Sequence, residues 1–197
     1  MNNAHTLQRI GAYIIDILLI AFLSVLLTMW IPKSEKYKAA IEEESNLLSD
    51  YSDKKINESE YIDRMYEARY TIEKENIVET IVSLVITFGY FSTFAYYNKG
   101  QTLGKKLLKI RIVTTDEKEV SHLRLMARAM IIGGCLADLI NLVLILIIKS
   151  NQYSYTIGIV EIIQSIILFS SLILMVSRKD KRGIHDLLCN TKVIEAQ

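Results

Sequence analysis

The fold of this chain is decided by RIGAYIIDILLIAFLSVLLTMWI, residues 9–31, an apolar run that carries only two charged side chains. Arg9 and Asp16 are seven residues apart, so a helix places them on one face, about 10 Å apart along its axis. A run of roughly 20 apolar residues is long enough to cross the ~30 Å hydrocarbon core of a bilayer. An ionised side chain within such a run must face protein or trapped water, so Asp16 marks either a functional site or a structural ion pair.

Three more apolar windows follow, and 51% of the 197 residues are hydrophobic. With the first run, the windows cover residues 10–31, 77–97, 125–148 and 155–176. This composition is too apolar for an ordinary soluble globule, and each window has the length of a membrane-spanning helix. The first window ends without the cleavage site of a signal peptide, so we expect it to remain as an anchor. The sequence predicts an all-α integral membrane protein with four transmembrane helices, forming a single domain over residues 1–197.

Lysine and arginine are unevenly distributed between the loops, and this distribution predicts the orientation. They are frequent in the loop 98–124 and in the tail 177–197, whereas the short loop between the third and fourth windows contains only Lys149. Because basic residues are enriched in short cytoplasmic loops, both termini and the 98–124 loop are expected in the cytoplasm. The chain is therefore expected to be a multi-pass membrane protein with residues 33–76 on the external side.

Residues 33–76 have the pattern of two helices. Apolar residues recur near helical spacing from Tyr37 to Tyr51 and again from Tyr61 onward, and Asn57 offers an N-cap for the second arm. The pattern predicts an external helical hairpin. No glycine or proline lies between residues 56 and 88, so the second arm is expected to run unbroken into the second transmembrane helix. The hairpin is either a docking or gating element or a solvated spacer.

The two basic cytoplasmic stretches predict a small interfacial cap. Residues 102–109 form a basic amphipathic turn whose lysines would contact anionic lipid headgroups, namely Lys105, Lys106 and Lys109. Residues 110–114 alternate like a strand, and 191–194 is the other β-rich stretch on that side. A lone strand needs a partner, so these two stretches are expected to pair as a two-stranded ribbon. Residues 184–188 are expected to form a short interfacial helix.

Four short blocks follow one another in order along the chain. They are Arg9-x-x-Ala12-x-x-x-Asp16, GQTLGKKLLKIRIV at residues 100–113, Leu125-x-x-Arg128, and RGIHDLLCNTKV at residues 182–193. Together these blocks resemble the RDD family of small bacterial membrane proteins, which is named after one arginine and two aspartates. Matched residue by residue, the resemblance implies that these three are Arg9, Asp16 and Asp186.

The resemblance also implies a protein of the bacterial inner or plasma membrane with a transport-related role. For the family, transport of an unidentified ligand is suggested, and one member has been linked to sodium/proton exchange. The segment 33–76 is longer than the family pattern leads us to expect. Four polar residues within the predicted spans also lie outside that pattern: Asp138, Asn141, Glu161 and Gln164.

Charged residues near the cytoplasmic ends of the first and third spans predict an inner polar layer made of Arg9, Asp16 and Arg128. At 1.5 Å per residue, Asp16 lies roughly 9 Å and Arg128 roughly 5 Å inside the boundary. Arg9 and Asp16 are too far apart for a contact within one helix, so we expect Asp16 to contact Arg128 or Tyr13. Asp186 from the tail is available to Arg9. The layer is either a brace that registers the helices or a gate for transport.

A second polar layer is predicted deeper in the bilayer, at roughly 20 Å from the cytoplasmic boundary. Asp138 and Asn141 are close on one face of the third span, and Glu161 and Gln164 are close on one face of the fourth. Oxygen ligands suit a hard cation such as sodium, and a desolvated carboxylate holds a proton when the cation is absent. These four residues are candidates for ion or proton binding, or the acids only form hydrogen bonds between helices.

Other chemistry finds no support in the sequence. The chain lacks phosphate-binding glycine loops and hydrolase or zinc-protease motifs, and its histidines are isolated: His5, His122 and His185. We expect no metal, cofactor, nucleic-acid binding or enzyme activity. The prediction is a transport-related membrane protein, with cation/proton exchange through buried carboxylates. The alternative is a non-transporting accessory or immunity-type protein that binds a partner through its external hairpin. Four helices enclose little space, so a pore would favour a homo-oligomer.

Overall fold

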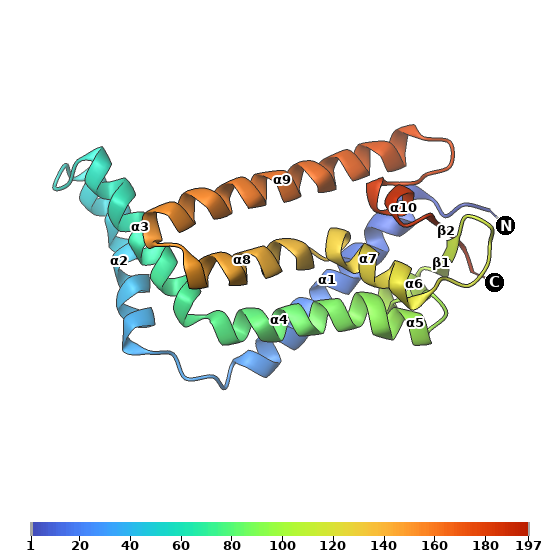
Figure 1. Cartoon of the computed structure of the whole chain (residues 1–197), viewed down its shortest axis with the longest axis horizontal. Coiled ribbons are helices and arrows are strands. Elements are labelled where there is room, and N and C mark those ends of the chain that lie inside the picture. The colour runs from blue at the N-terminus through green and yellow to red at the C-terminus, as the bar shows by residue number, and fades with distance from the viewer. Residues whose placement is uncertain (1, 197) are drawn as a thin grey trace.

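The computed structural model describes residues 2–196 and is elongated, with three parts along its length (Figure 1). A helical hairpin lies across one end, and long helices run through the middle. A small cap of short helices and two strands closes the other end, where the first and last described residues also lie. We refer to these two ends as the hairpin end and the cap end.

Three helices are long and apolar enough to cross a membrane. They are α1 (Thr6–Thr28), the continuous helical stretch Ile77–Tyr97, and α9 (Ser150–Ser177). The second of these consists of α4 (Ile77–Gly89), the π-helical turn η1 (Tyr90–Phe94) and α5 (Ala95–Tyr97). Most of their apolar side chains are exposed on the molecule, as expected for helices whose outer faces contact lipid.

The predicted helix over residues 125–148 is interrupted. It consists of α7 (His122–Ile132) and α8 (Cys135–Ile147), which are bent by 66° at Gly133 and Gly134. Gly134 has a φ of +74°, in the left-handed region that a glycine adopts without strain. The predicted third transmembrane helix is therefore two helices, and residues 2–196 contain a fourth candidate span only if this bent pair is counted as one.

Side chains from the neighbouring helices satisfy the backbone at this break. The last carbonyls of a helix have no partner within it, and in a bilayer no water replaces one. The hydroxyl of Tyr13 on α1 donates to the carbonyl of Ile132 at 3.0 Å, and Nε2 of Gln164 on α9 donates to that of Ile131 at 2.9 Å. The break is thus held by two other helices.

The predicted hairpin is confirmed as α2 (Glu35–Ser52) packed against α3 (Glu58–Glu75). Both helices begin with a side-chain cap, because Ser34 Oγ accepts from the amide of Tyr37 and Asn57 Oδ1 accepts from that of Glu60. Leu47 of α2 is fully buried.

The prediction that the second arm continues into the next span was wrong. The helix α3 ends at Glu75, Asn76 leaves the helical conformation, and the chain turns before α4 begins (Figure 1). The ammonium of Lys33 lies in this corner, 2.6 Å from both Asn76 Oδ1 and Glu79 Oε1. Polar contacts from a distant residue therefore hold a corner that no glycine or proline marks.

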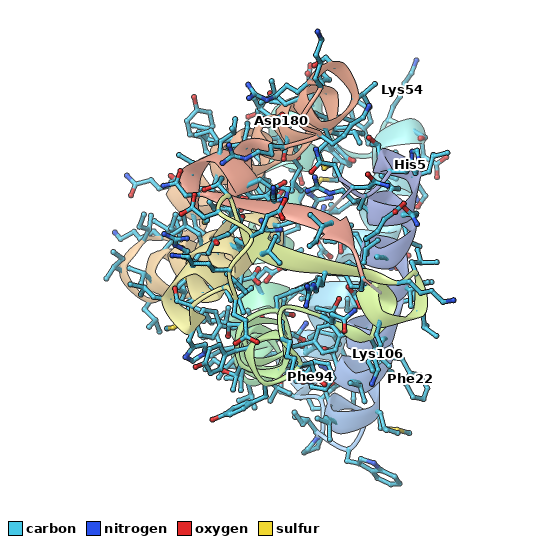
Figure 2. All side chains as sticks on the ribbon, turned by 90° about the vertical axis from the view of Figure 1, so that its right-hand side faces the viewer. His5, Phe22, Lys54, Phe94, Lys106 and Asp180 are labelled. Carbon is cyan, nitrogen blue, oxygen red and sulfur yellow. The ribbon has the colours of Figure 1, made fainter. Side chains whose placement is uncertain are left out.

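The predicted ribbon is confirmed in the cap. The strand β1 (Ile110–Thr114) pairs antiparallel with β2 (Thr191–Glu195), with Ile112 opposite Val193. Two short helices flank the ribbon, α6 (Leu103–Leu107) and α10 (Ile184–Leu188). Viewed from the cap end, the strands cross the centre of the face, and Lys106 lies toward its edge (Figure 2). The ribbon packs with Ala12 of α1 and Leu125 of α7 in one core cluster, so the cap is attached to the spans by apolar packing.

Candidate functional site

A buried carboxylate at the cap end joins two of the spans. Asp186 of α10 forms ion pairs with Arg9 of α1 and Arg128 of α7, and all three side chains are almost completely buried. Its Oδ2 also accepts from the backbone amide of Gly183 at 3.1 Å, and the guanidinium of Arg128 donates to Thr191 Oγ1 at 2.6 Å. The expectation that Asp186 is available to Arg9 is confirmed, and Asp186 is also the partner of Arg128.

Asp186 is held in its ionised form by these contacts. Burial alone raises the pKa of a carboxyl group, but the positive charges of Arg128 and Arg9 outweigh burial and hold the pKa of Asp186 well below its usual range. Two buried guanidinium groups therefore share one carboxylate. A single acid on the cap thus fixes the relative positions of α1 and α7.

His185, beside Asp186 on α10, is neutral and has one defined tautomer. Burial lowers its pKa to about 3. The guanidinium of Arg9, which can only donate, lies 3.3 Å from Nε2, so Nε2 is the acceptor and Nδ1 carries the proton. Nδ1–H then donates to Ser171 Oγ of α9 at 2.9 Å, and the same oxygen accepts from the amide of Ile184 at 3.1 Å. His185 therefore connects α9 to the same cluster.

We expect the folded protein to become less stable as the pH is lowered, because of His185. Its pKa is 6.5 in the unfolded chain and about 3 in the folded one. The unfolded state therefore binds more protons between these values, and stability falls on acidification through this window by about 1 kcal/mol per pH unit. Thermal unfolding in detergent between pH 7 and 4.5 measures this loss.

Two histidine variants separate this titration from other acid effects. His185→Gln keeps a donor and an acceptor but has no proton to gain, so its unfolding midpoint is expected to change less with pH than that of the wild type. His5→Gln removes an exposed histidine and should leave the wild-type slope. Equal slopes for wild type and His185→Gln would contradict the assignment of a neutral, buried His185.

Asp16 has its own set of partners, away from the two arginines. Its Oδ1 accepts from the hydroxyl of Tyr90 at 2.6 Å and from the amide of Gly104 at 2.7 Å. Its Oδ2 accepts from Thr102 Oγ1 at 2.5 Å and lies 3.5 Å from the ammonium of Lys105. The carboxylate is fully buried, so these four groups replace its hydration.

The expectation that Asp16 contacts Arg128 or Tyr13 was therefore wrong. Arg128 is engaged by Asp186, and the hydroxyl of Tyr13 is engaged by the freed carbonyl at the helix break. The predicted inner layer of Arg9, Asp16 and Arg128 is divided into two centres, each built around one acid.

The three lysines predicted at the headgroups do not share one environment. Lys106 and Lys109 are exposed, as contacts with headgroups require. Lys105 points inward to Asp16, with a side chain only 12% exposed, so its assignment to the headgroups needs correction. Burial lowers the pKa of Lys105 to about 8, although the charge of Asp16 opposes this shift.

The four residues of the predicted outer layer are not joined to one another. Asn141 Oδ1 accepts from the hydroxyl of Tyr153 at 2.5 Å, and Gln164 is engaged at the helix break. Asp138 is half-buried in the first turn of α8, and Glu161 is exposed on α9. Within residues 2–196, no hydrogen bond or ion pair links any two of these four, and no group of three or more His, Cys, Asp or Glu side chains could hold a metal.

Sequence reasoning gave no role in the two centres to four residues that complete them. Tyr90 and Thr102 bind Asp16, while His185 and Thr191 belong to the cluster around Asp186. Three of these four lie inside the recognisable blocks GQTLGKK and RGIHDLLCNTK, so the blocks held the signal. Tyr90 lies in the second span, where nothing in the apolar pattern distinguishes it from the neighbouring aromatic residues.

Comparison with known proteins agrees with the resemblance of the sequence blocks. The family model described as the RDD family matches residues 3–190, which is nearly the whole chain. No curated protein and no solved structure gave a match. The match includes the Arg9–Asp186 pair, the buried Asp16 and the cap up to the start of β2, and we conclude that this chain belongs to the RDD family.

Proposed function

We propose that this RDD-family membrane protein has a transport-related role, in which a proton is exchanged for a small cation at Asp138. The observation that carries this proposal is the broken helix pair α7 and α8, with a carboxylate one turn beyond the break. Transporters commonly bind their coupling ions where a membrane helix is interrupted, because the unwound backbone and the helix ends supply polar groups at that depth.

The environment of Asp138 fits this role. Its side chain is half-buried and forms no hydrogen bond or ion pair within residues 2–196, so its oxygens are available to a proton or a cation. Ionisable residues inside a span are costly and are mostly functional. The amides of the outer layer act here as supports, since Gln164 holds the break and Asn141 holds Tyr153.

Reconstitution of the full chain in liposomes tests the exchange. With a pH-sensitive dye inside, a sodium or potassium gradient is expected to drive proton movement above that of empty liposomes. Asp138→Asn should abolish this movement, while Asp63→Asn, which removes an exposed acid on α3, should leave it unchanged. Absence of any cation-driven proton movement in wild-type vesicles would contradict the proposal.

Glu161 separates two versions of the mechanism. Its carboxylate is exposed on α9 among apolar side chains such as Ile162 and Ile166, where hydrocarbon would surround it. A second copy of the chain packed on this face would remove Glu161 from lipid, which favours a homo-oligomer. If proton–cation exchange persists in Glu161→Gln, Asp138 is the only carboxylate that it requires. If exchange is lost, it requires both carboxylates, as the sequence predicted.

The hairpin favours a second candidate function, that of an accessory or immunity-type protein. It is capped and well packed, it lies across one end of the molecule, and α2 leaves Leu48 63% exposed and Ile41 41% exposed (Figure 1). We place this end outside the cell and the lysine-rich cap in the cytoplasm of a bacterial cell, following the distribution of basic residues. Vesicles without flux, together with capture of one membrane partner that depends on residues 33–76, would favour this function.

A further inference from the structure

A cavity of about 340 Å³ lies between the spans at the cap end. Its walls come from α1, η1, α7 and α9, and the cap closes its floor through Ile112, His185 and Val193. The volume is at the lower end of the ~300–1,000 Å³ found for small-molecule sites. The cavity is separate from Asp138, which does not line it, so its occupant is independent of the proposed exchange.

The wall of the cavity is apolar along the spans. Ile10 of α1, Ile132 of α7 and three residues of α9, Leu168, Phe169 and Leu172, line it. Phe169 is also 68% exposed, so the wall formed by α9 continues onto the outer surface of the molecule, where lipid lies in a bilayer. An apolar group can therefore lie along this wall without losing contact with hydrocarbon.

The cap end of the same cavity is cationic. Arg9, Lys105 and Arg128 line it, whereas the two buried carboxylates that pair with them, Asp16 and Asp186, do not. Three positive charges face two negative ones across this region, and the negative ones lie behind the cavity wall. The surface that an occupant would contact therefore attracts an anion.

Two of the cations have hydrogen-bonding capacity left. Within residues 2–196, all hydrogen bonds of Arg128 use Nη1, so Nε and Nη2 remain. The ammonium of Lys105 has three N–H donors and two polar neighbours, Thr102 Oγ1 at 3.2 Å and Asp16 Oδ2 at 3.5 Å, and it lies 5.8 Å from the centre of the Phe91 ring. Burial of Lys105 lowers its pKa to about 8, and an anion beside it would stabilise its charged form.

We propose that this cavity binds an amphipathic anion, with its carboxylate or phosphate head at Lys105 and Arg128 and a single hydrocarbon chain along α9. The combination of a mostly apolar wall with a few placed polar groups at one end is typical of sites for such ligands. The chain could belong to an anionic phospholipid of the bilayer or to a free single-chain acid, because both present the same head and tail to the cavity.

Photocrosslinking of the full chain in nanodiscs of zwitterionic phosphatidylcholine tests this proposal. The probe is a palmitate that carries a diazirine group. The readout is the labelling of residues 165–175, measured with and without an excess of unlabelled palmitate, and the specific signal is the part that this excess removes. Wild type should show such a saturable component. Lys105→Gln should weaken it about tenfold, because one charge-assisted contact with the head is lost. Lys106→Gln is the matched control, since this neighbouring lysine is exposed and outside the cavity, and it should bind as wild type does.

Two further variants keep the test independent of folding. Lys105→Arg preserves the charge and should restore competed labelling, and Ser165→Phe fills the cavity from an exposed position and should remove it. Only variants whose thermal midpoints equal that of the wild type are compared. The proposal would be overturned if excess palmitate did not reduce the labelling of the wild type. It would also be overturned if the palmitate-sensitive labelling were unchanged in both Lys105→Gln and Ser165→Phe.

Competition identifies the source of the ligand. Phosphatidylglycerol introduced into the nanodiscs should reduce palmitate-competed labelling if the natural occupant is a chain of a bilayer lipid. If phosphatidylglycerol has no effect while palmitate and decyl phosphate compete, the site takes free single-chain acids. Inorganic phosphate lacks the chain and should not compete, and competition by inorganic phosphate equal to that by decyl phosphate would contradict a role for the apolar wall.

Discussion

Replacing Asp186 with asparagine is expected to destabilise the protein by about 3–5 kcal/mol, the usual cost of removing one partner from a buried ion pair. The loss is large because Arg9 and Arg128 would remain buried with no carboxylate between them. It should appear as a lower thermal midpoint in detergent and as a lower yield of monodisperse protein on size-exclusion chromatography.

The neighbouring Asp180 provides the control. It pairs with Arg178 at 2.8 Å, but both side chains are about 40% exposed, and exposed pairs contribute about 0–1 kcal/mol. Asp180→Asn should therefore have little effect. In the double variant Arg128→Gln/Asp186→Asn, the combined loss should be smaller than the sum of the two single losses, because one uncompensated cation is removed. A midpoint for Asp186→Asn close to that of Asp180→Asn would contradict the bridging role.

The features that were predictable from the sequence depend on local pattern. The apolar windows identified the spans because a bilayer imposes length and composition on each helix separately. The hairpin and the ribbon followed from helical spacing with an N-cap at Asn57 and from two short β-rich stretches on one side of the membrane. In each case, the residues that carry the signal are those that form the element.

The features that were missed depend on distant partners. The turn at Asn76 is held by Lys33, more than 40 residues earlier, and no helix-breaking residue announces it. Gly133 and Gly134 are compatible with close packing of a straight helix, and the break depends on capping by Tyr13 and Gln164.

The partners of Asp16 were missed for a related reason. Three of them, Thr102, Gly104 and Lys105, come from a loop whose position on α1 is a tertiary property. The fourth, Tyr90, comes from η1. Counting residues along α1 and α7 therefore gave the wrong contact. The family blocks identified the important residues, because Arg9, Asp16 and Asp186 are all buried in the two acid centres. Helical geometry did not identify the partners of Asp16.

Gly104→Ala is expected to be strongly destabilising, because the glycine is required for space. A Cβ at this position would lie 2.2 Å from the carbonyl oxygen of Ala12 and 2.8 Å from Asp16 Oδ1. The first is backbone of α1 and cannot rotate away. Overpacking of this kind costs about 1–3 kcal/mol and occasionally more, and the shift would also lengthen the 2.7 Å hydrogen bond between the Gly104 amide and Asp16. We expect a loss of about 3 kcal/mol or more.

Gly158→Ala is the matched control for this prediction. Gly158 lies within α9, and a Cβ there would meet no atom within 4 Å. Because alanine favours a helix over glycine by about 1 kcal/mol, the control should be neutral or slightly stabilising. Thermal midpoints of the two variants in the same detergent give the comparison directly. Equal midpoints would mean that α6 can move away from α1 at little cost, and that the contacts of Asp16 with Gly104 and Thr102 do not hold the cap against the spans. A large difference would show that the glycine in this family block is there to let a loop backbone reach a buried carboxylate.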